Sequence, residues 1–161
     1  MDATNGDLKG FSEGFYRNLC GGRLDPILET LVYLKHETSV WLEIATLLIP
    51  GENDSETELD RMTAWIAQDL GPDTPLHFTA FYPNFKLLNR PITPEQTLVR
   101  AREIALRNGL HFVYCVSADP ATMATPGTAA LRAVSEGDFA RRWPPRRRPE
   151  ACFGQAQQMP P

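Results

Sequence analysis

The sequence predicts an α/β fold, in which parallel strands alternate with helices as in a partial TIM-type β/α barrel. Apolar runs typical of buried strands alternate with segments whose apolar residues recur at helical spacing. Each helical segment opens with a helix-start signal. This alternation predicts a parallel sheet with right-handed crossovers. A complete eight-fold barrel needs at least about 200 residues, so the pattern accounts for only part of one.

Four segments are predicted as strands. The second is nearly continuous in apolar residues, which is typical of a parallel strand covered on both faces. The first is weak because Gly6 interrupts it. The predicted strands are Ala3–Gly10, Val40–Ile49, Leu76–Phe81 and Leu110–Val116.

Helices are predicted between these strands. Asp25 supplies a capping acceptor before Pro26, and Ser55 and Glu58 form a capping-box pattern. Thr93-Pro94 is expected to start a further helix that Asn108-Gly109 ends. A short helix is expected from Ser12 to Leu19, before Gly21-Gly22.

Composition limits the function classes. The chain has 161 residues, 42% of them hydrophobic, which suits one domain with a packed core. No signal peptide or apolar run of membrane-spanning length occurs, so we expect a cytoplasmic protein with no membrane partner. The net charge of −4 gives no case for nucleic acid. The three cysteines, Cys20, Cys115 and Cys152, are too widely spaced for a disulfide framework or a zinc site.

A change in composition divides the chain at residue 116. Residues 117–161 hold 7 of the 14 prolines and 6 of the 16 basic residues. We therefore predict a domain at 1–116 and a Pro/Arg-rich, disordered tail at 117–161. The basic run of this tail could contact RNA or an acidic membrane, but a solvated tail without a function is the favoured interpretation.

Two loops carry the chemistry. Asp7 and Lys9 lie two residues apart, which places both side chains on one side of a strand where they can pair. Pro50-Gly51 forms a turn whose backbone could lie against a flat ring, with Asn53 and Asp54 as polar neighbours. The structural alternatives are an ordinary surface ion pair for Asp7 and Lys9 and an ordinary strand-to-helix turn for Pro50-Gly51.

Other candidates have structural alternatives of the same kind. The hydroxyl of Thr46 could face a barrel lumen or be satisfied in the core. His77 is expected to be structural, and Tyr82-Pro83 occupies the loop after the third strand. Trp41, Trp65 and Phe85 are expected to be packing residues.

Several segments resemble, in order and spacing, the later half of a radical SAM enzyme. The resemblance covers roughly residues 2–116 and is nearest to the AmmeMemoRadiSam system radical SAM proteins, relatives of the pyruvate formate-lyase activating enzyme. No glycine-rich nucleotide-binding loop competes with this assignment. The segments are Asp2-Ala-Thr-Asn-Gly-Asp-Leu-Lys-Gly-Phe11, Phe15 to Gly22, Thr46 to Ser55, Ala64 to Ala67, His77 to Phe81 and Thr93 to Gly109.

The resemblance implies a reaction and a ligand. The family cleaves S-adenosylmethionine reductively at a [4Fe-4S] cluster and so generates a 5′-deoxyadenosyl radical. The resemblance implies S-adenosylmethionine contacts at the aspartate–lysine pair, at the turn after the second strand and in the loop after the third. The implied residues are Asp7, Lys9, Thr46, Pro50, Gly51, Asn53 and Tyr82.

The departures from the family pattern limit what this chain is expected to do. No Cys-x-x-x-Cys-x-x-Cys motif occurs, so neither cofactor is expected to bind stably to this chain alone. Tyr82 stands where the family commonly has histidine. We expect a fragment of such an enzyme that is inactive by itself, with a separate chain supplying the missing N-terminal half-barrel as a possible partner.

Two other functions remain open at this point. The chain could be a non-catalytic binding or assembly module, including one half of a split radical SAM enzyme. It could also be an unrelated barrel hydrolase that uses Asp7, Glu43 and His77, although no motif supports that assignment.

Overall fold

The computed structural model describes residues 2–116, and they form one parallel sheet with helices beside it. The four strands are β1 (Ala3–Asp7), β2 (Trp41–Leu48), β3 (Leu76–Ala80) and β4 (Val113–Val116). Their order in the sheet is β1-β2-β3-β4, with every neighbouring pair parallel. The α/β prediction is confirmed, while each strand is shorter than the apolar run that predicted it. The predicted tail and Cys152 lie outside the described residues.

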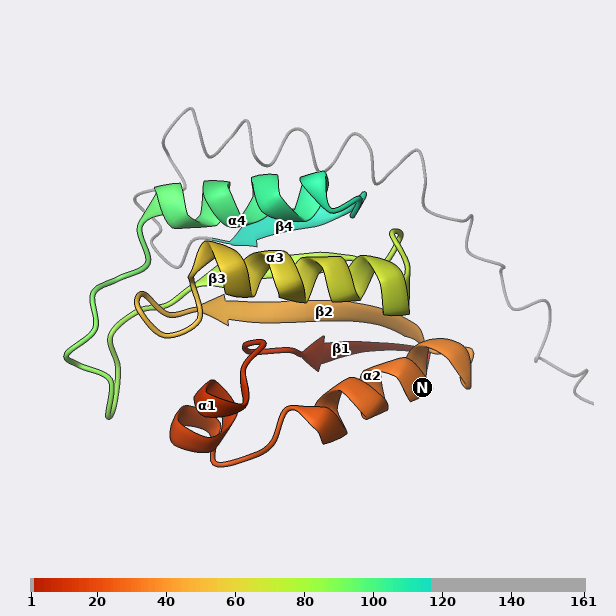
Figure 1. Ribbon diagram of the computed structural model, residues 1–161, viewed down its shortest axis with the longest axis horizontal. Coiled ribbons are helices and arrows are strands. Elements are labelled where there is room, and N and C mark those ends of the chain that lie inside the picture. The colour runs from red at the N-terminus through yellow and green to blue at the C-terminus, as the bar shows by residue number, and fades with distance from the viewer. Residues whose placement is uncertain (1, 117–161) are drawn as a thin grey trace, which may run out of the picture.

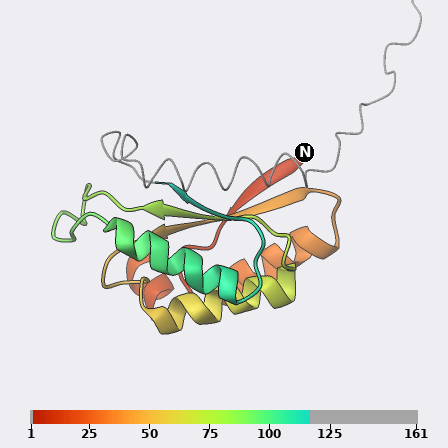
Figure 2. The same cartoon turned by 90° about the horizontal axis from the view of Figure 1, so that it is seen from above.

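The helices connect consecutive strands. They are α1 (Glu13–Phe15) with the π-helical turn η1 (Tyr16–Cys20), α2 (Asp25–His36), α3 (Glu56–Trp65) with the π-helical turn η2 (Ile66–Leu70), and α4 (Glu95–Arg107). Figure 1 shows all four strands running in the same direction. Figure 2, turned by 90°, shows that the described helices lie on one side of the sheet. The sheet therefore has a helix-covered face and a face that no described helix covers, called the helix-free face below.

The core lies between the sheet and these helices. Side chains alternate along β2 between buried and partly exposed, with Leu42, Ile44, Thr46 and Leu48 on the buried side. Trp41, Glu43, Ala45 and Leu47 point to the helix-free face. The expectation that this strand is covered on both faces is therefore not met within residues 2–116, because described helices cover one face only.

Gly6 has a packing role on the covered face. A Cβ atom added at Gly6 would lie 2.5 Å from Cδ2 of Leu31 in α2. The absence of a side chain thus lets α2 approach β1 closely. The residue that weakens the strand in the sequence pattern makes room for the helix that covers it.

Helix starts differ in detail from the sequence prediction. Asp25 was expected to cap α2, but α2 begins at Asp25 itself and Leu24 occupies the N-cap position without a side-chain cap. Ser55 caps α3 as predicted, since its Oγ accepts a hydrogen bond from the Glu58 backbone N–H. Helix α4 begins at Glu95, with Pro94 as its N-cap residue. The predicted stops at Gly21 and Gly109 hold, both at positive φ, and Gly71 after η2 also has a positive φ.

Candidate functional site

The candidate site lies at the carboxyl edge of the sheet, where β1, β2 and β3 run into their loops. Parallel strands bring these loops together at one edge, which is where β/α barrels carry their active sites. The loops contain Asp7 to Phe11, Pro50 to Ser55 and Tyr82 to Pro94.

Asp7 and Lys9 form the predicted ion pair. Lys9 Nζ lies 3.0 Å from Asp7 Oδ2, and both side chains are exposed. An exposed pair of this kind adds little to folding stability. Its charges therefore stay accessible to a ligand from solvent.

The backbone beneath this pair is held by buried side chains. The Lys9 N–H donates a hydrogen bond to the Tyr16 hydroxyl at 3.0 Å, and the Lys9 carbonyl accepts one from Asn53 Nδ2. Burial raises the pKa of Tyr16, and the hydrogen bond from the Lys9 backbone acts in the opposite direction. The side chain of Lys9 therefore extends from a fixed main chain.

Asn53 connects the first two loops. Its Oδ1 accepts from the Ile49 N–H at 2.7 Å, and its Nδ2 also donates to the Leu47 carbonyl at 2.8 Å. The residue is 2% exposed, and its Nδ2 already serves two carbonyl groups. Asn53, which the family resemblance implied as a ligand contact, thus has a structural part here and presents its amide to the protein.

Thr46 also has a structural part. It is fully buried on the helix-covered face, where its hydroxyl donates to the Leu8 carbonyl at 2.7 Å and lies 3.9 Å from the sulfur of Met62. Its side chain points toward α3 and away from the helix-free face. Of the two alternatives that the sequence left for Thr46, the structure shows the satisfied core threonine and not the lumen-facing hydroxyl.

Pro50 and Gly51 form the predicted turn. Gly51 has a φ of 78°, and a Cβ atom added there would meet no atom within 4 Å. Its N–H donates to Asp54 Oδ1 at 2.8 Å, which fixes the turn. The turn therefore presents an exposed stretch of backbone near Asp7 and Lys9, with nothing beside Gly51 to block a flat ligand.

The third loop contributes Tyr82, whose side chain is exposed. Thr93 anchors the other end of this loop. The Thr93 hydroxyl accepts from the Phe81 N–H at 2.7 Å and donates to the Leu48 carbonyl at 2.6 Å. One buried hydroxyl thus joins the ends of β2 and β3. The sequence pattern assigned Thr93 to a helix start and gave no sign of this contact.

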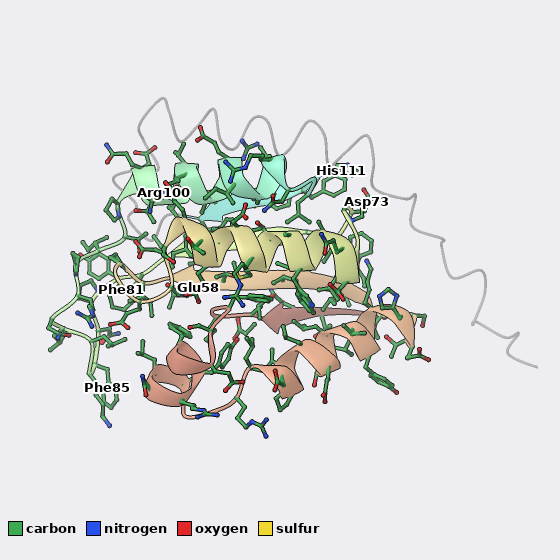
Figure 3. All side chains as sticks on the ribbon, viewed as in Figure 1. Glu58, Asp73, Phe81, Phe85, Arg100 and His111 are labelled. Atoms are coloured by element: carbon green, nitrogen blue, oxygen red, sulfur yellow. The ribbon has the colours of Figure 1, made fainter. Side chains whose placement is uncertain are left out.

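Glu58 has a second role that the capping-box pattern did not reveal. Its Oε1 accepts a hydrogen bond of 2.7 Å from the Phe11 N–H, 47 residues earlier in the chain. A Cβ atom added at Gly10 would lie 3.1 Å from this oxygen and 2.7 Å from Cδ1 of Phe15. Figure 3 labels Glu58 between α3 and the loop after β1. Gly10 and Glu58 together fix where the Asp7–Lys9 loop turns.

A polar cluster lies on the helix-free face. The Glu43 carboxylate is 3.0 Å from His77 Nε2 and accepts from Trp41 Nε1 at 3.0 Å. The His77 ring stacks on Tyr114 with ring centroids 4.9 Å apart. These residues lie on strands away from the carboxyl edge, and Asp7 pairs with Lys9 instead. The structure therefore brings together two of the three residues of the hydrolase alternative and supports His77 as structural.

The described residues do not fit an iron–sulfur cluster. No group of three or more His, Cys, Asp or Glu side chains within residues 2–116 is arranged to hold a metal ion. Cys20 follows α1 near β1, whereas Cys115 lies in β4 at the other edge of the sheet. Burial raises the pKa of Cys115 to about 11 and also raises that of Cys20. Burial thus disfavours the thiolate form that cluster ligation needs.

Known proteins give two comparisons. The chain is 40% identical over 114 residues to a curated protein of Methanocaldococcus jannaschii, "Uncharacterized protein MJ0808". The match covers 71% of this chain, which spans about a third (34%) of the length of that relative. No protein-family model matches the chain.

The second comparison concerns the fold. The chain is similar to the crystal structure of a domain of pyruvate-formate lyase-activating enzyme from Bacteroides vulgatus, with a TM-score of 0.62 and 16% sequence identity. The match covers 71% of this chain and 66% of that one. The parallel sheet with its flanking helices is thus an arrangement shared with a domain of an activating enzyme. No helix among residues 2–116 has the length and apolar character needed to cross a membrane.

Proposed function

We propose that residues 2–116 are the S-adenosylmethionine-binding part of a radical SAM enzyme. The observation that carries this proposal is the placement of Asp7, Lys9, Gly51 and Tyr82 in three consecutive loops at the carboxyl edge. Their order along the chain follows the resemblance to the AmmeMemoRadiSam system radical SAM proteins. The fold similarity to a domain of pyruvate-formate lyase-activating enzyme supports the same assignment.

Each of these groups can contact a different part of S-adenosylmethionine. The Asp7 carboxylate accepts hydrogen bonds from ribose hydroxyls or an ammonium group, and Lys9 pairs with a ligand carboxylate. The backbone at Pro50-Gly51 lies flat against the adenine, because Gly51 has no side chain to prevent it. The exposed Tyr82 ring adds apolar area and a hydroxyl at the third loop.

The [4Fe-4S] cluster of the proposed parent enzyme would supply the electron that cleaves S-adenosylmethionine. Its cysteine ligands have no counterpart among residues 2–116, so we assign no step of that reaction to them. The proposal places the ligands in a separate N-terminal half-barrel and the reaction in the cytoplasm. This chain alone then orients the ligand without cleaving it.

Binding to this chain alone is expected to be weak. Without chelation of its amino and carboxylate groups by iron, the ligand keeps only the polar and backbone contacts described above. We expect a dissociation constant on the order of 1 mM, equivalent to about 4 kcal/mol.

Amide chemical shifts measured on the ¹⁵N-labelled full chain test the proposal. Titration with millimolar S-adenosylmethionine should move amides at Asp7 to Lys9, at Gly51 and at Tyr82. Lys9→Ala should weaken the titration, whereas Lys35→Ala should leave it unchanged. Lys35 is the matched control because it lies in the last turn of α2, which leads to the amino end of β2.

Two outcomes would overturn the assignment. One is the absence of any shift at the carboxyl edge with the ligand in millimolar excess. The other is a set of shifts that Lys35→Ala reduces as much as Lys9→Ala. Either result would favour the non-catalytic assembly module that the sequence left open.

A further inference from the structure

The loop between β3 and α4 exposes apolar side chains to an unusual degree. Phe85 is 80% exposed and Leu88 is 71% exposed, and Tyr82 and Ile92 are also exposed. Figure 3 shows Phe85 at the tip of this loop, pointing away from the sheet and helices. These residues, 82 to 92, are called the apolar loop below.

The apolar loop is held in place at its base. Leu87 packs against the core, and its N–H donates to the Asn84 carbonyl at 3.0 Å. Arg90 pairs with Glu52 of the second loop. Phe85 adopts a φ of 50°, a conformation that a residue with a side chain rarely takes. An anchored loop that turns its aromatic tip outward is better suited to contact another surface than to cover its own core.

Charge indicates what kind of surface fits. The apolar loop carries Lys86 and Arg90 and no acidic residue, although residues 2–116 hold 10 basic against 16 acidic side chains. Arg90 is already paired, which leaves the Lys86 ammonium, 5.4 Å above the Phe85 ring. A complementary surface therefore has an apolar centre with carboxylates beside it. Residues 2–116 carry a net negative charge, and Lys86 is the one cation of the apolar loop outside an ion pair. Both facts argue against binding of the loop to an anionic membrane.

The chain itself presents such a surface. Tyr33 in α2 is 58% exposed, more than the other large apolar side chains exposed outside the apolar loop in residues 2–116. Glu29 and Glu37 lie four residues before and after it and are exposed as well. Side chains four apart share one face of a helix, so Glu29 lies beside Tyr33 on α2, and Glu37 follows directly as the C-cap residue of the same helix.

We propose that the apolar loop of one molecule docks on α2 of a second copy of this chain. Phe85 and Leu88 would pack on Tyr33, and Lys86 would lie between Glu29 and Glu37. Figure 1 shows that the loop and the C-terminal end of α2 lie at opposite ends of the domain. In the proposed two-fold dimer, the loop of each copy contacts α2 of the other copy, so the same pair of surfaces meets twice and the buried area doubles.

Sedimentation velocity of the full chain tests this proposal. We expect a concentration-dependent monomer–dimer equilibrium, with Phe85→Ser/Leu88→Ser and Tyr33→Ser each weakening it by at least about tenfold. Leu106→Ser is the matched control, because Leu106 is an exposed apolar residue outside both surfaces. Circular dichroism should confirm that all variants keep the same secondary structure.

A charge exchange tests the pairing itself. Lys86→Glu should weaken the dimer, and so should Glu29→Lys/Glu37→Lys. Mixing these two variants should give a dimer in which both contacts are charge-matched, one with the original charges and one with the charges exchanged, and should therefore recover the association. A strictly monomeric chain at high concentration, or a dimer lost with the loop variants but unaffected by Tyr33→Ser and by the charge exchange, would overturn the proposal. Loop-dependent binding to vesicles of phosphatidylcholine and phosphatidylserine without self-association would overturn it as well.

Discussion

On the helix-covered face of the sheet, Ile44, Leu48 and Phe78 are fully buried. On the helix-free face, Glu43 and His77 retain about a quarter of their side-chain exposure, 28% and 27%. The two sets of side chains alternate along the same strands. They share the same backbone and differ in whether described helices cover their face of the sheet. The comparison teaches that apolar packing on one face stabilises residues 2–116, while polar groups on the other face can be changed at low cost.

The largest expected difference between the faces comes from adjacent residues of β3. Phe78→Ala should lower the free energy of unfolding by about 3–5 kcal/mol, because it removes a fully buried ring and leaves a cavity. Thr79→Ala on the helix-free face should cost less than about 1 kcal/mol. Urea denaturation of the two variants measures both values. Equal losses would mean that the helix-free face is as tightly packed as the covered one.

A smaller difference is expected at the carboxyl edge. Asn53→Ala removes three hydrogen bonds and leaves the Ile49 N–H and two carbonyl groups without this partner. We expect a loss of about 2–4 kcal/mol in the free energy of unfolding. Asp54→Ala is the matched control, since its exposed bond to the Gly51 N–H should be worth about 1 kcal/mol or less. If thermal and urea unfolding give the two variants the same stability, Asn53 does not join the loops as described.

The smallest effect is expected on the helix-free face itself. Glu43→Ala removes the carboxylate that contacts His77 and Trp41, but water can reach this partly exposed cluster and replace the lost contacts. The loss should be less than about 1 kcal/mol. Glu58→Ala is the comparison, because the Phe11 N–H then loses its charged acceptor, at a cost of about 1.5–3 kcal/mol. A larger loss for Glu43→Ala than for Glu58→Ala, measured by urea denaturation, would reverse the comparison of the two regions.

Periodicity and capping signals were enough to predict the four parallel strands and the helices between them. These signals depend only on residues close together in the chain. The apolar runs of the strands and the glycines with positive φ at helix ends are local patterns of this kind. The Asp7–Lys9 pair was predictable for the same reason, since the two residues lie on one strand end.

Contacts between distant residues were not predictable. Thr93 matched a helix start, and Glu58 matched a capping box, yet each forms its decisive hydrogen bond with a residue of another loop or strand. Thr46 and Asn53 have side chains that suit either a ligand or a backbone group. Only the register of β1 against β2 decides which of these they meet.

The hydrogen bond between Glu58 and the Phe11 N–H also affects how the chain reaches its fold. It spans 47 residues, so the loop after β1 cannot settle until α3 has docked on the sheet. Groups that come together this late have little structure in the folding transition state, and weakening them mainly accelerates unfolding. We therefore expect the loss of the Glu58 carboxylate to shorten the lifetime of the folded carboxyl edge, and to leave the rate at which the sheet assembles largely unchanged.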